Sequence, residues 1–436
     1  MTQAVDEPRT QGALDEAASA ALGKQLDDAP WLTALRAAAA TEATAKAMPT
    51  TKERPWKYLD VSSLAIGDYR PVVGDKKTIS ADAVRERYGV EADGAAVAVF
   101  EDSAPVFVEQ TGHMLVPFGA ANTHEAATLE KTVTNAVPMD RSKLSALHYA
   151  FLAGGLLVNV PANEEVQKPI RIVRAFSSAG QLATPHTVIV TGANSRVRII
   201  EDFRSSNEDM IALPAVEILP GADSRVEYTS LHRWGKETRV FKEQRTVTNK
   251  AAEVVSLTVA TGAKVLKHHI EASLEGRGSS SEVLGLTVGN ANQHHNFYTL
   301  QDHIGEDTRS DLIIKSALDG ASRAVYYGVT RVGLHARRSD ANQENRNLLL
   351  SKQAKADSDP VLEILTNDVI RCSHGATAGP VNEEQLYYLQ TRGLDRAAAE
   401  DLLVWGFLSQ VLDRVPGDEL REEIAQSLEA KLKEGA

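Results

Sequence analysis

The chain is poor in cysteine, because its 436 residues include only one, Cys372. A lone thiol forms no internal disulfide, so sulfur does not cross-link this fold. It also falls short of the several thiolates that a zinc knuckle or an iron–sulfur cluster normally needs. A metal bound by Cys372 must therefore take its remaining ligands from histidines, carboxylates or a second chain.

A basic charge balance and long apolar runs are also absent. The net charge of −12 leaves no general basic field, which argues against a nucleic-acid partner. The longest uncharged apolar stretch, Tyr149 to Val160, is too short to span a bilayer. Residues 1–7 are polar and acidic with no apolar segment behind them. Together with the scarce cysteine, these features predict a soluble cytoplasmic protein without a membrane partner.

Several catalytic signatures are missing as well. The sequence contains no Gly-x4-Gly-Lys-Ser/Thr phosphate loop, no Gly-x-Ser-x-Gly nucleophile elbow and no His-Glu-x-x-His zinc motif. We therefore expect that the chain does not hydrolyse ATP itself.

Helix-forming residues dominate both ends of the chain. Residues 14–46 are rich in alanine, leucine, glutamate and lysine, with Pro30 as an interruption. Near the other end, Asn382 and Asp395 are predicted N-caps of helices that run to Gly393 and Val415, and a charged helix follows over 418–434. The predicted organisation is an N-terminal helical and mixed region (1–140), a β core (141–380) and a C-terminal helical region (381–436).

The middle of the chain predicts strands. Short β-branched runs recur between Gly, Asn, Asp and Ser turns, at Leu156–Val160, Ile170–Val173, Thr187–Val190, Arg196–Ile200, Val254–Val259 and Ala324–Val332. The segment Gly192–Val197 returns as Gly221–Val226, an offset of 29 (221 minus 192), with a third version at Gly320–Val325 and a fragment at Gly262–Val265. A returning turn favours a β-solenoid, with a β-sandwich as the competing interpretation.

Cys372 and His374 form the most suggestive pair of side chains. They follow residues 361–365, which are typical of a strand, and positions i and i+2 of a strand share a face. Both side chains can then approach one ion, and Arg371 and His374 would stabilise a thiolate if they lie close in space. The alternative is that Cys372 is a small buried hydrophobic residue.

Other metal-ligating residue types are present but less well patterned. In the pairs His268-His269 and His294-His295, adjacent strand residues face opposite ways, so at most one of each joins a single site. We favour surface or rung-stacking positions for these residues and for His303. The remaining candidates are three carboxylates, which serve as oxygen ligands or bases if they are not simply exposed turn residues: Glu363, Asp368 and Glu383.

An ordered set of motifs near the C-terminus carries a family resemblance. The runs in question are Asn342–Asn345, Asn347–Ser351, Pro360–Ile364, Cys372–Thr377, Asn382–Leu389 and Arg392–Leu394. In this order they closely resemble the C-terminal signature of the SufB/SufD family of iron–sulfur cluster assembly scaffolds. The Cys-Ser-His-Gly-Ala-Thr form is similar to the SufD branch, and so is the segment Arg54–Tyr58.

The resemblance implies a right-handed parallel β-helix core flanked by helical regions, in a scaffold subunit that is not an enzyme. It implies pairing with a SufB-like protein and recruitment of a SufC-like ATPase through the C-terminal helices. The residues assigned to this recruitment are Leu386, Tyr388, Leu389 and Arg392. A transient iron–sulfur cluster would form at the subunit interface, with Cys372 and His374 as ligands and the partner completing the shell.

Three questions stay open at this stage. One is whether the chain pairs with itself when its partner is missing. The second is whether the β-helix instead carries a carbohydrate-active enzyme. The third is whether the chain is a purely architectural subunit in which Cys372 has no ligand role.

Overall fold

The computed structural model describes residues 14–75, 77–91, 96–109 and 114–434. The acidic residues 1–7, which enter the prediction of a cytoplasmic protein, lie outside this part of the chain. Within it, no helix combines the length and apolar character that crossing a membrane requires.

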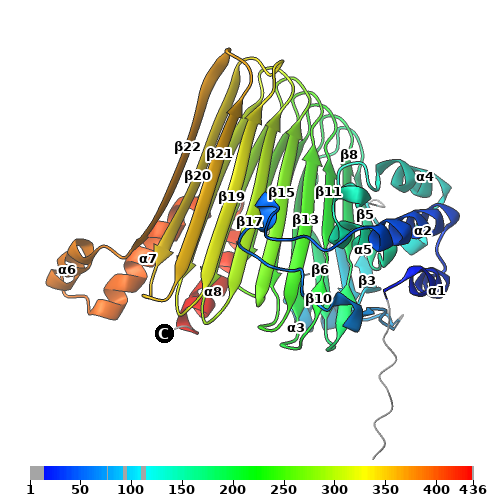
Figure 1. Ribbon diagram of the computed structural model, residues 1–436, viewed down its shortest axis with the longest axis horizontal. Helices are drawn as coiled ribbons and strands as arrows, with labels where there is room; N and C mark the ends of the chain where they lie inside the picture. The colour runs from blue at the N-terminus through cyan, green and yellow to red at the C-terminus, as the bar shows by residue number, and fades with distance from the viewer. Residues whose placement is uncertain (1–13, 76, 92–95, 110–113, 435–436) are drawn as a thin grey trace, which may run out of the picture.

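Two large sheets run the length of the molecule (Figure 1). Sheet A has 12 strands: β1 (Arg70–Pro71), β4 (Leu115–Pro117), β5 (Gly155–Val160), β7 (Gln181–Ala183), β8 (His186–Thr191), β10 (Ile211–Ala212), β11 (Ala215–Leu219), β13 (Arg239–Val247), β15 (Val265–Leu274), β17 (His294–His303), β19 (Arg323–Val332) and β21 (Lys355–Ile364). Sheet B has 10 strands: β2 (Val97–Glu101), β3 (Ala104–Glu109), β6 (Ile170–Phe176), β9 (Arg196–Ser205), β12 (Arg225–Arg233), β14 (Glu253–Ala260), β16 (Ser280–Gly289), β18 (Arg309–Leu318), β20 (Ser339–Leu349) and β22 (Val369–Pro380).

From β11 onward, successive strands alternate between the two sheets, and each strand pairs in parallel with the strand two places along. This connectivity is that of a β-solenoid, which confirms the prediction and excludes an antiparallel sandwich. Antiparallel pairing among the described strands is confined to the start of the solenoid, where β3 pairs with β2 and β4 pairs with β5. Strands β2, β3 and β4 precede the predicted boundary at residue 140, so the two sheets already begin within the region predicted as helical and mixed.

The returning turn has a structural cause at one edge of the solenoid. Asn194, Asp223 and Asp307 occupy the same place in three turns of one stack with φ of 56°, 58° and 60°, a left-handed conformation that Asn and Asp tolerate well. Each donates its backbone N–H to a carbonyl of the next turn at 2.9 Å. The later Gly262 and Gly320 versions lie at the opposite edge, before strands of sheet A. The weak repeat therefore joins two different stacks of turns.

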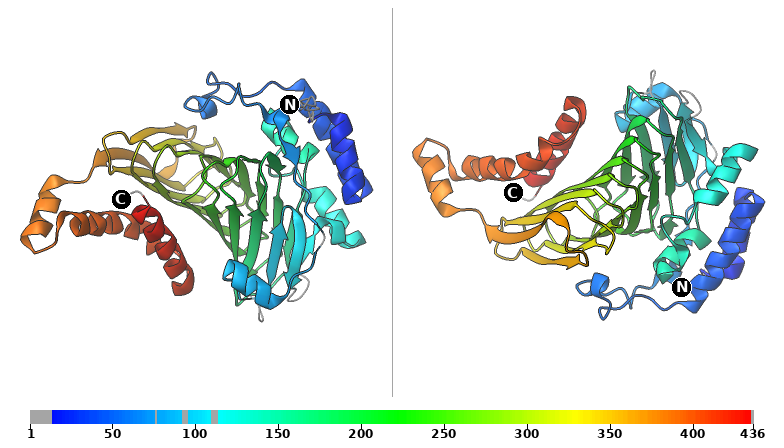
Figure 2. Two further views of the ribbon diagram at one scale, coloured as in Figure 1. Left: turned by 90° about the horizontal axis from the view of Figure 1, so that it is seen from below. Right: turned by 90° about the horizontal axis from the view of Figure 1, so that it is seen from above.

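Helices cover the outer faces of the solenoid (Figures 1 and 2). They are α1 (Glu16–Leu26), α2 (Pro30–Ala45), α3 (Ala81–Tyr88), α4 (Thr123–Thr132), α5 (Lys143–Ala150), α6 (Glu383–Thr391), α7 (Arg396–Leu412) and α8 (Asp418–Lys433), with short 3-10 turns at Arg54–Trp56, Ile66–Asp68, Phe118–Ala120 and Met139–Arg141. The predicted caps are confirmed, because the side chains of Asn382 and Asp395 cap α6 and α7. Pro30, predicted as an interruption, is the first residue of α2 and so separates this helix from α1.

The N-terminal helices cover the first rungs of sheet A. Apolar residues of α2 and α5 form one core with Leu157 and Val188 of the sheet. Arg36 is buried there and donates to the carbonyl oxygens of Ala150 and Leu152 at 2.9 and 3.0 Å. This end of the solenoid is thus closed by packed helices.

A segment that we call the strap, residues 46–69, continues from α2 across the outer face of sheet A (Figure 1). Trp56 is buried against Phe241, with ring centroids 6.2 Å apart. Lys267 donates its Nζ to the carbonyl oxygen of Pro55 at 2.5 Å. These contacts carry the strap from the helical end toward the last rungs.

The C-terminal helices α7 and α8 fold back onto the outer face of sheet B (Figure 2). Leu408 and Ile424 join a core that includes Leu231 and Leu284 of the sheet. Ion pairs frame this core, such as Arg414 with Glu282 at 2.5 Å. Within α7, Leu408, Val411 and Leu412 are buried, whereas Leu402 is 51% exposed and Leu403 is half-buried.

Candidate metal and partner-docking site at the open end of the solenoid

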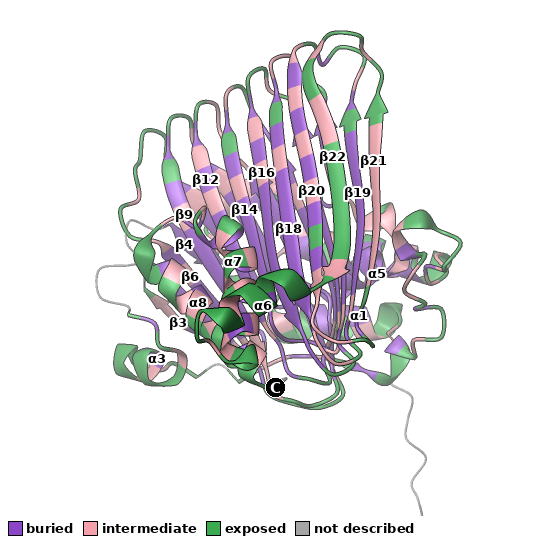
Figure 3. Ribbon diagram, turned by 90° about the vertical axis from the view of Figure 1, so that its left-hand side faces the viewer, coloured by how far each residue is buried: buried purple, intermediate pink, exposed green. Residues whose placement is uncertain are grey.

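The last rung of the solenoid, β21 and β22, is open. Each strand pairs on one side only, β21 with β19 and β22 with β20, and neither has a second neighbouring strand in the described part of the chain. No residue of either strand is buried, although the neighbouring β19 is largely buried and β20 is buried at alternate positions. Figure 3 shows this change of burial at the end of sheet B. We call this rung the open end.

Cys372 and His374 both lie on β22 at this open end. Their register partners on β20 are Ala341 and Gln343, which are buried inside the solenoid. The two side chains therefore share one face of β22 and point into the uncapped space between the sheets, as the spacing predicts. Cys372 is half-buried and His374 is exposed. A partner that meets the open end would find both.

A register shift precedes Cys372. Ser339 and Asp340 of β20 pair with Val369 and Arg371, which leaves Ile370 without a register partner. The side chain of Ile370 is 69% exposed. A bulge of this kind changes the direction in which side chains point at the edge of a sheet. Here it determines which residues of β22, Cys372 among them, face the interior.

The surroundings of Cys372 do not favour a thiolate. Partial burial, followed by the negative charge of Asp340, raises the pKa of the Cys372 thiol above its ordinary value. Arg371 does not counter this effect, because its Nε donates to Asp340 Oδ1 at 2.9 Å. The sequence suggests that Arg371 stabilises a Cys372 thiolate, but its guanidinium is instead paired with Asp340. Metal binding at Cys372 must displace a proton from a neutral thiol.

Amide side chains form the floor beneath the open end. Gln343 accepts from Thr330 Oγ1 at 2.8 Å and donates to the carbonyl oxygen of Gly328 at 3.1 Å. Asn345 accepts from Ser358 Oγ at 2.6 Å, which links the two sheets across the interior. A groove of about 280 Å³ runs between β20 and β22 beside His374. Sequence reasoning missed these amides, although their alternation at 343, 345 and 347 on one strand is a usable signal.

The described residues contain no group of three or more His, Cys, Asp or Glu side chains placed to hold one metal ion. The three candidate carboxylates lie elsewhere. Glu363 is on the face of β21 opposite to the interior, Asp368 is in the turn before β22, and Glu383 is on α6 in an ion pair with Arg396 at 2.8 Å. Cys372 and His374 thus form a half-site, with ligand types that suit iron.

The paired histidines face opposite sides of sheet A, as adjacent strand residues must. His268, His295 and His303 are buried in the interior, His269 is buried on the outer face beneath Trp56 of the strap, and His294 is half-buried. A surface position is therefore wrong for the four buried residues, and a rung-stacking position is confirmed for His268 and His269 by ring contacts with the next rung. The ring of His269 lies 4.9 Å from that of Tyr298 on the next rung. Burial lowers the pKa of His295 and His303 to about 4, so both are neutral at pH 7.

Helix α6 carries the predicted partner-contacting residues and projects from the body of the solenoid (Figure 1). Tyr388 and Arg392 are exposed, and Arg392 Nη2 donates to Tyr388 Oη at 3.2 Å. Leu389 is half-buried, whereas Leu386 is fully buried. Tyr387, which sequence reasoning did not select, is 70% exposed.

Comparison with known proteins identifies a family. The family model "SUF system FeS cluster assembly, SufBD core domain" matches residues 174–407, which is more than half of the chain. The iron-sulfur cluster assembly protein SufD of Bacillus subtilis is 24% identical over 92% of this chain and 94% of its own length. A SufBD family protein of Mycobacterium leprae is 27% identical over 68% of this chain and 76% of its own. The SufB protein of Bacillus subtilis is 25% identical over 64% of this chain and 60% of its own.

Proposed function

The chain belongs to the SufBD family of the SUF iron–sulfur cluster assembly system, and from that premise we propose that it is a non-catalytic cytoplasmic scaffold subunit. In this role it holds iron, or a nascent iron–sulfur cluster, jointly with a second scaffold chain. The observation that carries the proposal is the half-site: Cys372 and His374 share one face of the last strand, at an end of the solenoid with no third ligand in reach among the described residues.

Unpaired strand edges support a second chain as partner. β21 and β22 each present a row of backbone N–H and C=O groups that no described strand satisfies, and such edges template the addition of strands from another chain. A related solenoid with its own open end meets this geometry best. Similarity to a SufB protein as well as to a SufD protein makes a SufB-like partner the natural choice.

Mixed ligation across a separable interface suits a cluster that must be handed on. The iron–sulfur cluster is cargo here, held by one thiolate and one imidazole from this chain and by ligands from its partner. Because binding requires loss of the Cys372 proton, cluster loading is favoured as pH rises and as the partner excludes water from the site. Separation of the two chains then removes half of the ligands and releases the cargo.

Helix α6 supports recruitment of an ATPase. Its exposed tyrosines, Tyr387 and Tyr388, lie on the same helix as Arg392. Among the described elements, α6 packs mainly against α7. Tyr and Arg are the residue types that dominate binding energy at protein interfaces. We place the contact with a SufC-like ATPase on this helix, with Leu386 as a packing residue that holds it on α7.

The ligand role is tested in the assembled complex. The chain is co-expressed with a SufB-like protein and a SufC-like ATPase, and iron and sulfide are measured on the purified complex. His374→Ala and Cys372→Ser are each expected to lower the iron content several-fold at unchanged subunit stoichiometry. Thr377→Ala, an exposed residue of the same strand, is the matched control. Unchanged iron in both ligand variants would show that the chain is architectural only.

The docking role of α6 is tested by surface substitution, because removal of residues after 380 would also strip α7 and α8 from sheet B. Tyr387→Ser combined with Tyr388→Ser is expected to abolish capture of the ATPase while the circular dichroism of the chain stays unchanged. Gln390→Ala, exposed on the same helix, is the control. Full ATPase capture by the double variant would move this contact to another surface.

A further inference from the structure

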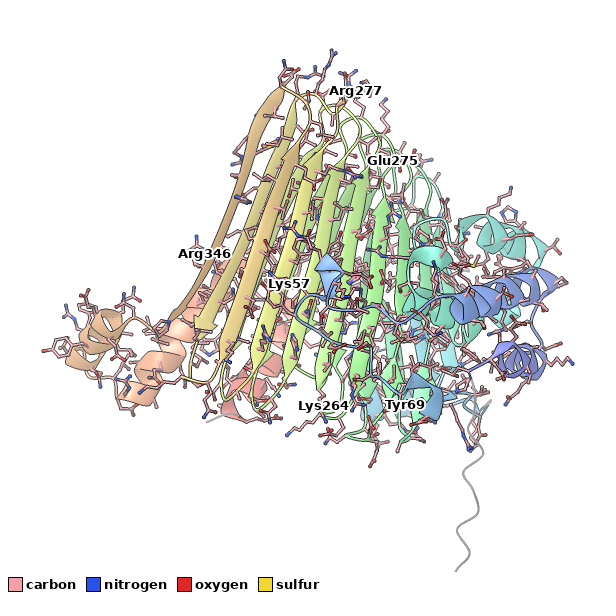
Figure 4. The ribbon with its side chains drawn as sticks, viewed as in Figure 1. Lys57, Tyr69, Lys264, Glu275, Arg277 and Arg346 are labelled. Carbon is pink, nitrogen blue, oxygen red and sulfur yellow. The ribbon has the colours of Figure 1, made fainter. Side chains whose placement is uncertain are left out.

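A buried chain of polar side chains joins the N-terminal helices to the first rungs of sheet A, at the end of the solenoid away from Arg346 (Figure 4). His148 Nε2 on α5 lies 2.8 Å from His186 Nδ1 on β8. On its other side, His186 Nε2 lies 3.2 Å from Glu217 Oε1 on β11. None of the three residues is more than 3% exposed. The hydrogens of this chain must therefore be supplied by the protein groups themselves.

The hydrogen of the His148 ring is placed by its backbone partner. His148 Nδ1 lies 2.6 Å from the carbonyl oxygen of Leu213, which only accepts hydrogen bonds, so this nitrogen is the donor. Burial, followed by the neighbouring His186, lowers the pKa of His148 well below its ordinary value, so the ring is neutral. Its Nε2 is then a bare acceptor, and the hydrogen between the two rings belongs to His186 Nδ1.

The Glu217 carboxylate requires a hydrogen on the remaining nitrogen of His186. Its Oε1 accepts from the backbone N–H of Thr134 at 2.8 Å, and its Oε2 accepts from that of Ala136 at 2.7 Å. Hydrogen bonds from such donors favour the ionised form of a carboxylate. A neutral His186 with its hydrogen on Nδ1 would therefore turn a bare nitrogen toward an anion. A second hydrogen, on Nε2, converts this contact into an ion pair.

The geometry points to a buried proton-binding site at His186, where the imidazolium pairs with the Glu217 carboxylate and latches the N-terminal helices to sheet A. The two partners hold different parts of this cover: Glu217 binds the backbone at 134–137, and His186 binds α5 through His148. Loss of the proton sets a lone pair against the carboxylate and weakens both attachments at once. The N-terminal helices then open from the first rungs as the pH rises. This inference does not depend on the proposed function.

The other titratable and charged groups around the pair hold their protonation states. They are Tyr149 of α5, Arg174 of β6, and Glu243 and Arg245 of β13. Burial and the charge of Glu217 raise the pKa of Tyr149 well above its ordinary value, so its hydroxyl stays neutral. Burial raises the pKa of Glu243, but the charge of Arg141 outweighs burial and brings this pKa to about 2. Arginine keeps its charge in proteins, so His186 is the member of this set that exchanges a proton.

The protonation of His186 can be measured directly at its ring nitrogens. The full chain is labelled with 15N-histidine and studied by NMR at about pH 7.5, above the ordinary histidine pKa of about 6.5. Scalar coupling across the hydrogen bond between the two rings assigns them without any variant. His186 is expected to carry hydrogen on both nitrogens and His148 on one. A bare nitrogen on His186 would overturn the inference.

Glu217→Gln removes the charge that retains the proton. Its amide supplies an N–H to a neutral ring while its oxygen still accepts from the backbone, so His186 is expected to lose one hydrogen. Glu130→Gln removes the same charge at an exposed position of α4 and is the control, in which His186 is expected to match wild type. A doubly protonated His186 in Glu217→Gln would overturn the ion pair.

Hydrogen exchange of residues 134–150, corrected for the intrinsic exchange rate, measures the opening between about pH 7 and about pH 9.5. The closed form holds a proton that the open form has lost, so the opening constant is expected to rise about tenfold per pH unit until the closed form also loses it. The rise is expected to disappear in Glu217→Gln and to persist in Glu130→Gln. Opening that is independent of pH in wild type, or that rises equally in Glu217→Gln, would overturn the latch.

Discussion

The two ends of the solenoid differ in how their terminal rungs are covered. At the first rungs, α2 and α5 close the outer face of sheet A, and nearly every residue of β5 is buried. At the last rung no residue of β21 or β22 is buried. A stacked repeat needs a cap wherever its neighbour is missing. The described residues place no such cap beside Cys372, and the proposed partner chain would supply it.

The largest expected effect is a difference in the free energy of unfolding between alanine substitutions of two arginines in sheet B. Arg174, at the closed end, is fully buried and pairs with Glu201 at 3.0 Å. Arg174→Ala leaves the Glu201 carboxylate buried without its partner, which is expected to lower the free energy of unfolding by about 3–5 kcal/mol. Arg371→Ala removes a mostly exposed pair with Asp340 and is expected to cost about 0–1 kcal/mol. Urea denaturation of both variants measures the difference, and equal losses would contradict it.

Apolar truncation draws the same contrast. Leu157→Ala, in the core between sheet A and the N-terminal helices, is expected to destabilise the chain by about 2–5 kcal/mol because it opens a cavity. Ile370→Ala removes a side chain that is 69% exposed, so we expect a change within about 0.5 kcal/mol. Binding of the Ile370→Ala variant to a SufB-like chain is then compared with that of wild type, and weaker binding would show that the partner covers Ile370. A large loss of stability in the isolated chain would mean that Ile370 is already packed.

A buried lysine makes the stability of the solenoid depend on pH. Burial, opposed by the charge of Glu201, lowers the pKa of Lys242 to about 7. The folded chain then binds fewer protons than the unfolded chain between about pH 7 and the ordinary lysine pKa of about 10.4. The contribution of this group to the free energy of unfolding rises with pH across that window, by about 1.4 kcal/mol per unit. As pH falls to 7, the chain loses this contribution.

Lys242→Met is expected to lower the slope by about 1.4 kcal/mol per pH unit while keeping the volume of the side chain. A similar slope remains, because burial lowers the pKa of Lys267 to about 7 as well. Denaturant midpoints at pH 7.5, 8.5 and 9.5 measure the change. Lys264→Met, a half-buried lysine in an ion pair with Glu237, is the control and is expected to leave the slope unchanged. A slope in Lys242→Met equal to that of wild type would assign the dependence to other groups.

The smallest expected effect concerns the thiol at the open end. Asp340→Asn removes a negative charge that raises the pKa of Cys372, so we expect alkylation by iodoacetamide to accelerate a few-fold near pH 8. Mass spectrometry over a pH series measures the shift of the profile to lower pH. Glu344→Gln, a carboxylate on the same strand, is the control. Complex formation with a SufB-like chain is expected to protect the thiol in all three proteins.

Local sequence signals predicted the elements well where one residue decides a boundary. Asn382 and Asp395 cap their helices, and Pro30 interrupts the N-terminal helical stretch, as expected, because a side-chain cap or a fixed φ acts within a single turn. The solenoid itself was predictable from short strands between returning turns. The membership of the early strands β2 to β4 in the two sheets, and the difference between the two stacks of turns, were not predictable, because both depend on pairing between residues far apart in the chain.

The candidate site shows the same division. The common face of Cys372 and His374 follows from the two-residue period of a strand, whatever surrounds it. The stabilisation by Arg371 did not follow, since Asp340 on the neighbouring strand engages that guanidinium. Nor did the burial of Leu386, which depends on how α6 meets α7.

By itself, the sequence of this protein determined the solenoid, its helical ends and a Cys-x-His pair on one strand face, because caps, turns and strand alternation act over a few residues. Only the tertiary structure decided that this pair lies on the uncapped rung, that three of the four paired histidines are buried, and that α7 and α8 leave the open end uncovered. These outcomes depend on which surfaces cover one another. Coverage is set by contacts between residues a hundred or more positions apart, such as Lys267 with Pro55 and Arg414 with Asp311.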